Sequence, residues 1–155
     1  MQSPATAAAP YRRFALMIFV SMLVMFGLMY LNTYSIDHVY FSQTRAYMTV
    51  LMGAAMAVVM LGFMWHMYPG STIKVGILVG SVVAAAAALW LVRSQQTVDD
   101  VAYMRAMIPH HSIAILTSER ARIHDPRVRK LADGIIATQR KEIAEMQQLI
   151  SDLDH

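Results

Sequence analysis

Three long apolar runs precede a polar tail. The runs extend from Phe14 to Ile36, from Ala46 to Trp65 and from Val75 to Val92, and none contains a charged residue. Each reaches or approaches the ~18 to 20 residues that a helix needs to cross ~30 Å of hydrocarbon. The first run is too long for the core of a signal peptide, so it is interpreted as a retained anchor. The pattern predicts three transmembrane helices at about residues 14–34, 46–66 and 74–92.

The polar tail begins at Arg93. It contains nine of the 13 basic residues and nine of the 10 acidic residues, so we expect it to lie in water. Thr97 to Asp100 has the composition of a capped helix start. Asp125-Pro126 combines a cap acceptor with a proline suited to the first helical position. These signals predict a helical hairpin that turns near residue 125.

The predicted hairpin has an apolar face that two helices cannot bury alone. Apolar residues recur at helical spacing in its second helix, and Leu116 and Ile123 do so in the first. A second hairpin from another subunit would complete a four-helix bundle, so we expect a homo-oligomer, a dimer or larger. The predicted fold is all-α, with an N-terminal segment at 1–13, a membrane domain at 14–92 and the hairpin at 93–155.

Composition narrows the possible chemistry. Of all residues 57% are apolar and 15% are charged, so lipid must solvate part of the chain. Because there is no cysteine, disulfides, thiolate zinc sites and iron–sulfur clusters are excluded, and any soft metal ligand must be one of the 14 methionines. The net charge of +3 is small, and we expect no nucleic-acid partner.

Candidate metal ligands gather on two predicted helix faces. In the first tail helix, candidate ligands follow one another at steps of four, three and four, from Asp100 through Met104 and Met107 to His111. His110 comes three residues after Met107. In the second helix Gln139, Glu142 and Met146 form a similar stripe. A turn near residue 125 would pair Met104 with Met146, Met107 with Glu142 and His111 with Gln139. The candidate ligands are Asp100, Met104, Met107, His110, His111, Glu142 and Met146.

Thioether sulfur and imidazole nitrogen together favour copper, and Cu(I) over Cu(II). Zinc or another divalent metal fits less well, because zinc prefers thiolates or more histidine and carboxylate. Pro109 precedes the histidines, and a proline inside a helix costs about 3 kcal/mol, which indicates a local constraint. The alternative interpretation is structural: the methionines pack a core, His110 is solvated and Asp100 completes the helix cap.

The tail motifs resemble the DUF305 family. The resemblance rests on Met107-Ile-Pro-His110-His111, on Asp125-Pro126 and on the Gln139, Glu142, Met146 stripe, and covers about residues 97 to 150. Tyr11-Arg-Arg, Asp37-His38-Val-Tyr40 and Met67-Tyr-Pro69 are similar to its membrane-anchored bacterial branch. The resemblance implies a ferritin-like half-bundle and an exported copper-binding domain, with His110, His111, Met107 and Met146 as ligands. The chain departs from the family at Thr117, where many members carry methionine.

These patterns predict a membrane-tethered copper-binding protein that acts in periplasmic metal homeostasis or resistance. Arg12-Arg13 before the first span favours a cytoplasmic N-terminus, which puts the tail outside the cytoplasm of a bacterial inner membrane after three crossings. A copper donor or acceptor protein would be its partner, and no pattern supports an enzyme. Two alternatives remain open: a Cu(I) conduit along the membrane methionines, and a metal-free oligomeric scaffold.

Overall fold

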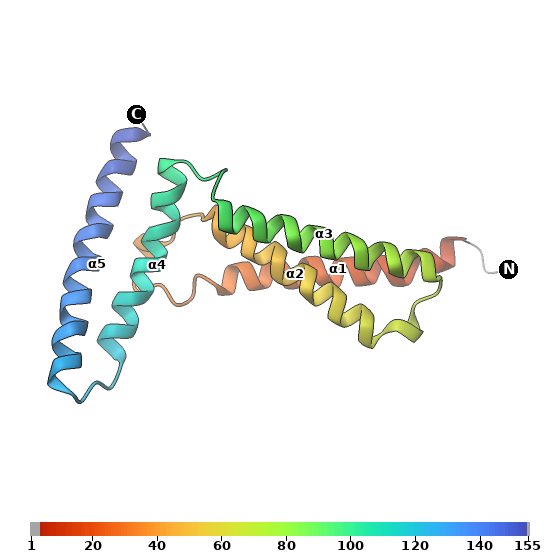
Figure 1. Ribbon diagram of the computed structural model, residues 1–155, viewed down its shortest axis with the longest axis horizontal. Helices are drawn as coiled ribbons and strands as arrows, with labels where there is room; N and C mark the ends of the chain where they lie inside the picture. Colours follow the sequence, from red (N-terminus) through yellow and green to blue (C-terminus); the bar gives the residue numbers. More distant parts are fainter. Residues whose placement is uncertain (1–3, 155) are drawn as a thin grey trace. The chain divides into compact units, whose positions relative to one another are not determined.

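The computed structural model describes residues 4–154 and is all-α over that range, as the sequence predicts (Figure 1). Five α-helices and two short 3-10 helices, η1 and η2, follow one another along the chain. They are α1 (Pro4–Leu28), η1 (Ile36–His38), α2 (Gln43–Phe63), η2 (Trp65–Met67), α3 (Ser71–Ser94), α4 (Asp100–Arg120) and α5 (Pro126–Leu153).

The chain divides into two compact units. One unit contains the residues up to Leu28 together with Thr44–Gln95. The other contains Met29–Gln43 together with the residues from Gln96 onward. The connection between the first two apolar helices therefore belongs to the same unit as the C-terminal hairpin, which its position in the sequence does not suggest.

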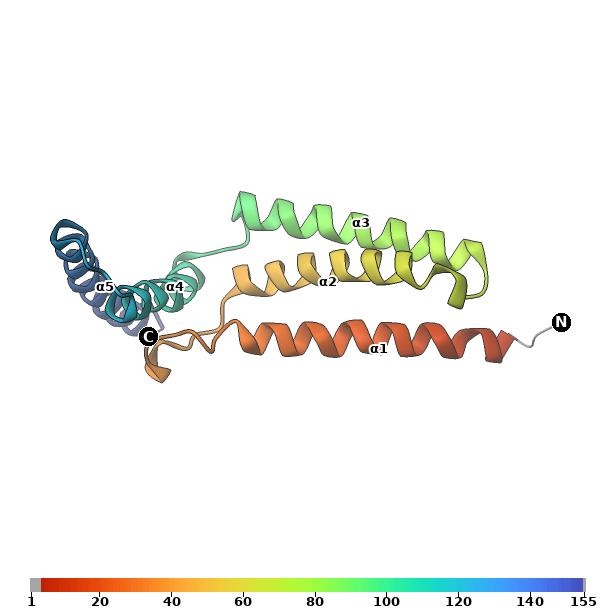
Figure 2. The same cartoon turned by 90° about the horizontal axis from the view of Figure 1, so that it is seen from below.

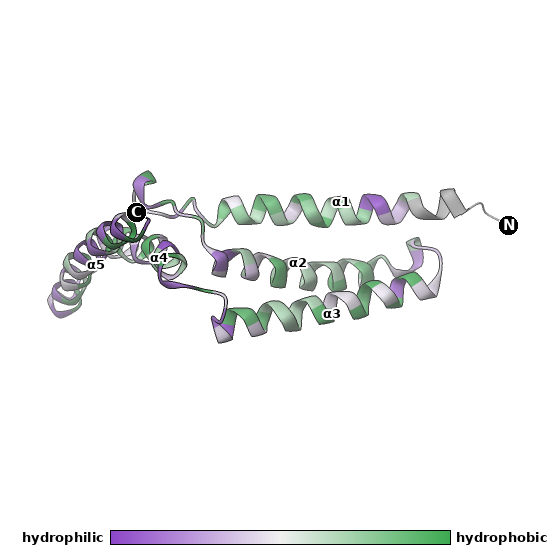
Figure 3. Ribbon diagram, turned by 90° about the horizontal axis from the view of Figure 1, so that it is seen from above, coloured by the Kyte–Doolittle hydropathy of each residue, from purple (hydrophilic) through white to green (hydrophobic). Residues whose placement is uncertain are grey.

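The first unit consists of three apolar helices that lie side by side (Figure 2). Ala9–Leu28, Gln43–Phe63 and Ser71–Ser94 are each long and apolar enough to cross a membrane. Most of their residues are hydrophobic (Figure 3). Outward-facing apolar side chains of this kind are what a lipid environment solvates and water does not. The prediction of three helices with the length and composition of membrane spans is confirmed, with bounds that differ from the predicted ones.

Small residues and aromatic rings hold this unit together. Phe14 of α1 and Leu61 of α2 share a buried core with Tyr68, whose ring stands edge-on to Phe14 at 5.6 Å between centroids. Where α1 approaches α2, a Cβ added to Gly53 would lie 2.4 Å from Sδ of Met22, so the absence of a side chain there permits the close packing. The methionines of α2 are half-buried, and Met60 packs against the core.

The second unit is built on the antiparallel pair α4 and α5 (Figure 1). Its core contains Met104, Ile108 and Ile115 from α4 and Ile143 and Ile150 from α5. These positions recur at helical spacing, so one face of each helix is buried against the other.

The segment between α1 and α2 also packs on the hairpin. Helix α1 ends at Leu28, whereas the sequence pattern extends the first span to about residue 34. The chain turns here because the carbonyl of Tyr30 accepts hydrogen bonds from the amide (3.3 Å) and the hydroxyl (2.9 Å) of Thr33. Further along the segment, Tyr40 packs against the hairpin core.

Candidate metal centre

Helix α4 brings four of the predicted ligands to one side of the hairpin. Its start is fixed by Asp99, whose carboxylate accepts a hydrogen bond from the Ala102 amide at 2.8 Å. From that cap the helix runs without interruption through Pro109 to Arg120. At 3.6 residues per turn, steps of four, three and four keep Asp100, Met104, Met107 and His111 on one face.

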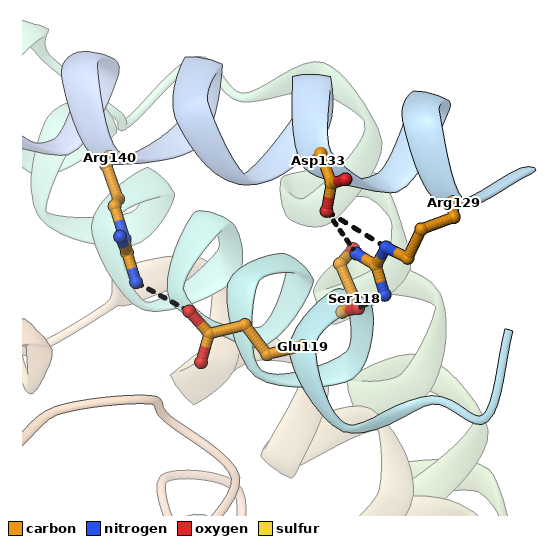
Figure 4. Close-up of polar contacts among 5 residues, drawn as sticks. All are labelled: Ser118, Glu119, Arg129, Asp133 and Arg140. Atoms are coloured by element: carbon orange, nitrogen blue, oxygen red, sulfur yellow. Dashed lines mark hydrogen bonds and ion pairs between the residues drawn. The ribbon is translucent and has the colours of Figure 1, made fainter. Parts of the chain in front are cut away.

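Helix α5 is held against α4 by polar contacts near both ends. Arg105 donates to the Asp154 carboxylate at 2.6 Å at one end of the hairpin. Toward the connecting loop, Arg140 pairs with Glu119 at 2.5 Å and Arg129 donates to the Ser118 carbonyl at 3.0 Å (Figure 4). Arg129 also pairs with Asp133 at 2.8 Å on its own helix. These contacts join α5 to α4 in addition to the apolar core that the two helices share.

A cleft of about 650 Å³ opens between the two helices. Six of the seven predicted ligands line it: Asp100, Met104, Met107, His111, Glu142 and Met146. Met104 forms its floor with only 7% of its surface exposed, while Met107 and Met146 are half-buried. The structure thus places three thioethers, one imidazole and three carboxylates around one space, the third carboxylate being that of Glu145.

The ring of His111 has an unsatisfied nitrogen in this cleft. Its Nδ1 is buried and makes no hydrogen bond. Glu142 Oε2 lies 3.4 Å from this atom, which is within ion-pair distance but lacks hydrogen-bond geometry. Burying an unpaired polar atom costs about 1 to 3 kcal/mol. A metal ion bound by this nitrogen would explain why it has no hydrogen-bond partner.

Burial favours the neutral form of the His111 ring. Burial lowers the pKa of His111; Glu142 opposes that effect by favouring the protonated ring, and His110 adds to the lowering. A neutral imidazole carries a free lone pair on one nitrogen, which is the form that coordinates metals. The environment therefore favours the state of His111 that a metal site requires.

His110 is not brought into the cleft. Its side chain is exposed, it does not line the space, and its ring centroid lies 6.3 Å from that of His111. Consecutive residues on a helix differ by about 100° in direction, so two adjacent histidines cannot both face the same partner helix. Of the predicted ligands, His110 alone stands apart from the other six.

The predicted register across the hairpin differs from the one in the structure. The sequence pairs His111 with Gln139, but in the structure His111 lies beside Glu142. Gln139 instead lines a second hollow, nearer the connecting loop. Glu142 comes three residues after Gln139, and its position puts a carboxylate next to the imidazole.

The cleft also contains residues that the sequence analysis did not select. Tyr103, Glu145, Leu149 and Leu153 complete its lining. Helical spacing could have identified most of them, since Tyr103 precedes Met107 by four residues and Leu149 follows Met146 by three. Leucine and tyrosine carry no metal signal, so a search for ligand types passes over them.

A second polar cluster lies on another side of α4 and was also not predicted. Ser112 is fully buried, and its Oγ accepts a hydrogen bond from the Tyr34 amide at 2.7 Å and lies 2.9 Å from Nδ1 of His38. Burial lowers the pKa of His38, and the neighbouring Asp37 opposes that shift. This cluster fastens the segment between α1 and α2 to the helix that carries His111.

Among residues 4–154, no group of three or more histidine and carboxylate side chains is placed to hold a metal ion. A metal site in the hairpin would therefore depend on methionine sulfur as well as on His111. The donor set of the cleft meets that condition.

Comparison with known proteins finds a family similar to the hairpin, but that family has no assigned function. Residues 91–155 match the family model described as "Domain of unknown function (DUF305)", which agrees with the resemblance of the tail motifs. An uncharacterized protein of Acanthamoeba polyphaga mimivirus is 41% identical over 66 residues, which is 41% of this chain and 43% of that protein. The chain thus matches less than half of that relative's length. No solved structure matches. The C-terminal hairpin is similar to a domain of unknown function, and three membrane-length helices precede it.

Proposed function

We propose that the protein is membrane-tethered and binds copper in the cleft between α4 and α5, for metal homeostasis or resistance. One observation carries the proposal: a buried imidazole nitrogen without a hydrogen-bond partner shares a cleft with three methionines. His111, Met104, Met107 and Met146 would hold the ion. Glu142 and Asp100 at the same cleft would balance its charge.

The donor set supports Cu(I) above other metals. Thioether sulfur is a soft ligand, and imidazole binds both copper oxidation states, so the combination suits the monovalent ion. Zinc is less well served, because the chain has no thiolate and the cleft contains only one histidine. Mg²⁺ and Ca²⁺ require a shell of oxygen ligands, whereas the cleft is mainly lined by apolar and sulfur-bearing side chains.

The proposed location is a bacterial inner membrane, with the hairpin on the periplasmic side. Three membrane-length helices support a multi-pass protein. Arg12 and Arg13, both exposed in α1, favour a cytoplasmic N-terminus, and three crossings then put the hairpin on the other side. There the open cleft would exchange copper with a donor or acceptor protein.

The two adjacent histidines provide the test and its matched control. His111→Ala in the full chain, purified in mild detergent, should weaken Cu(I) affinity at least about tenfold, because even outer residues of metal sites cost 10- to 100-fold when removed. His110→Ala makes the same chemical change one residue away, outside the cleft, and should leave the affinity near that of the unsubstituted protein. Competition with a coloured Cu(I) chelator measures both.

Each other result counts against the proposal. Equal and unchanged affinity in both variants would move copper to the membrane methionines, which is the conduit alternative. A loss with His110→Ala but not with His111→Ala would put the site on the exposed face. If the unsubstituted protein binds no copper, the scaffold alternative stands. Far-ultraviolet circular dichroism should show equal helix content in all three proteins.

A further inference from the structure

Helix α5 has a second apolar face that nothing in its own unit covers. Ala132, Ile143 and Ile150 are buried on one side of the helix. Five large apolar residues on an adjacent side remain 37% to 65% exposed. They form two groups with internal steps of three or four residues, one from Val128 to Ile135 and one from Leu149 to Leu153, and at 3.6 residues per turn both groups fall on one side of the helix. We call these residues the outer stripe: Val128, Leu131, Ile135, Leu149 and Leu153.

The outer stripe runs through the metal cleft. Leu149 and Leu153 line the cleft itself. Leu131 and Ile135 line a second hollow of about 580 Å³ toward the connecting loop. Glu142 and Met146 lie between these two groups in the sequence and also face the cleft. Whatever covers the stripe would therefore also close the metal cleft.

The charges along this face are divided by sign. Arg127 and Lys130 border the hollow near the start of α5. Glu142 and Glu145 border the cleft toward its end. A second α5 laid antiparallel on the first would place the basic end of each helix toward the acidic end of the other, whereas a parallel helix would bring like charges together. The charges that border the hollow and the cleft therefore favour the antiparallel arrangement.

We propose that a second copy of this chain packs its α5 antiparallel against the outer stripe, around a two-fold axis, and so closes both copper clefts. The spacing of the stripe sets the register. Leu131 lies opposite Leu149 of the partner subunit, Val128 opposite Leu153 of the partner subunit, and Met146 opposite Ile135 of the partner subunit. Such an interface is isologous, because each contact occurs twice.

Closure would change the chemistry of the site. In the single chain the cleft is open to water along the stripe, and Met107 and Met146 are only half-buried. An apolar side chain from the partner would exclude water from the thioethers, which favours the soft monovalent ion. This part of the inference rests on the proposed copper function, whereas the pairing of the helices does not.

Cysteine cross-linking tests the pairing without any metal, because the chain contains no cysteine of its own. Full-length Leu131→Cys and Leu149→Cys chains, carrying different tags, are produced together in one membrane and oxidised. We expect disulfides between the two variants and few within either variant alone. Ala144→Cys, exposed on another side of α5, is the control and should not cross-link.

Two cross-linking results would overturn the pairing. Cross-links of Leu131→Cys with itself would mean a parallel arrangement. The absence of cross-links in every combination would mean that lipid or another protein covers the stripe.

A second measurement tests closure of the copper site. Leu131→Lys with Ile135→Lys changes two exposed residues that do not line the cleft, so the hairpin should keep its helix content. The double variant should be a monomer in mild detergent and should bind Cu(I) at least about tenfold more weakly. A monomer with unchanged Cu(I) affinity would overturn closure. If the dimer cross-links but no variant binds copper, the copper proposal fails and the pairing stands.

Discussion

Three consecutive residues of α4 take three different roles. His110 is exposed, His111 lines the cleft, and Ser112 is fully buried against the segment that contains Tyr34 and His38. The rotation of about 100° per residue produces this division. The sequence could identify the paired histidines as chemically important. The spacing also put His111, and not His110, on the stripe that faces the second helix, although both histidines were kept as candidate ligands.

The contact between His38 and Ser112 predicts a local dependence on pH. Burial lowers the pKa of His38 below that of the same residue in an unfolded chain, so the unfolded form binds more protons. Stability from this contact is therefore present above the unfolded pKa and is lost as pH falls through the folded pKa. We expect the amide of Tyr34, which donates to Ser112, to lose protection from hydrogen exchange as pH falls from about 7.5 to 5.

Hydrogen-exchange mass spectrometry of the full chain, corrected for the intrinsic pH dependence of exchange, measures this loss. His38→Gln should make protection of this segment nearly independent of pH. His124→Gln, which changes an exposed histidine in the loop between α4 and α5, should preserve the pH dependence of the unsubstituted protein. Protection that rises on acidification would contradict the assignment.

At the level of helices, the sequence predicted well which helices form, and it predicted less well which of their residues contact each other. Helix α4 begins within the predicted segment from Thr97 to Asp100, where Asp99 is the cap. The Asp125-Pro126 start is as predicted, and Asp125 accepts a hydrogen bond from the Arg127 amide at 2.8 Å. These signals are local, so a single segment contains them. The contact of His111 with Glu142 is not local, because it depends on how two separate helices pack against each other. Periodicity therefore predicted the helix faces that line the cleft, but not which residue of α5 lies beside His111.

The first apolar helix carries the prediction of orientation. Arg12 and Arg13 precede most of its apolar residues, and no basic residue follows until Arg45. Basic residues are retained on the cytoplasmic side, so the C-terminus should be exported. Alkaline phosphatase fused to the C-terminus, which is active only when exported, should therefore be active, and green fluorescent protein fused there should not fluoresce. Phosphatase silence with fluorescence would place the hairpin in the cytoplasm and contradict the proposed location.

At the level of the whole molecule, each unit leaves a different surface without cover. The three apolar helices expose side chains that lipid would solvate, whereas the hairpin exposes one apolar stripe beside charged residues. A sequence pattern can indicate both surfaces, and the need for an oligomer was predicted on that basis. The close association of Met29–Gln43 with the hairpin was not predictable, because it depends on contacts between residues far apart in the sequence, such as Tyr34 with Ser112.

The central claim is that methionine sulfur and His111 hold copper in the hairpin. X-ray absorption at the copper edge tests it most directly, using the full chain in detergent loaded with less than one equivalent of Cu(I). The spectrum should contain sulfur scatterers together with nitrogen. Replacing Met104, Met107 and Met146 together by Leu preserves size while removing sulfur, and should eliminate the sulfur shell.

The matched control replaces Met52, Met56 and Met60 of α2 by Leu and should leave the spectrum unchanged. A sulfur shell that survives in the hairpin variant and disappears in the α2 variant would contradict the account and place copper among the membrane helices.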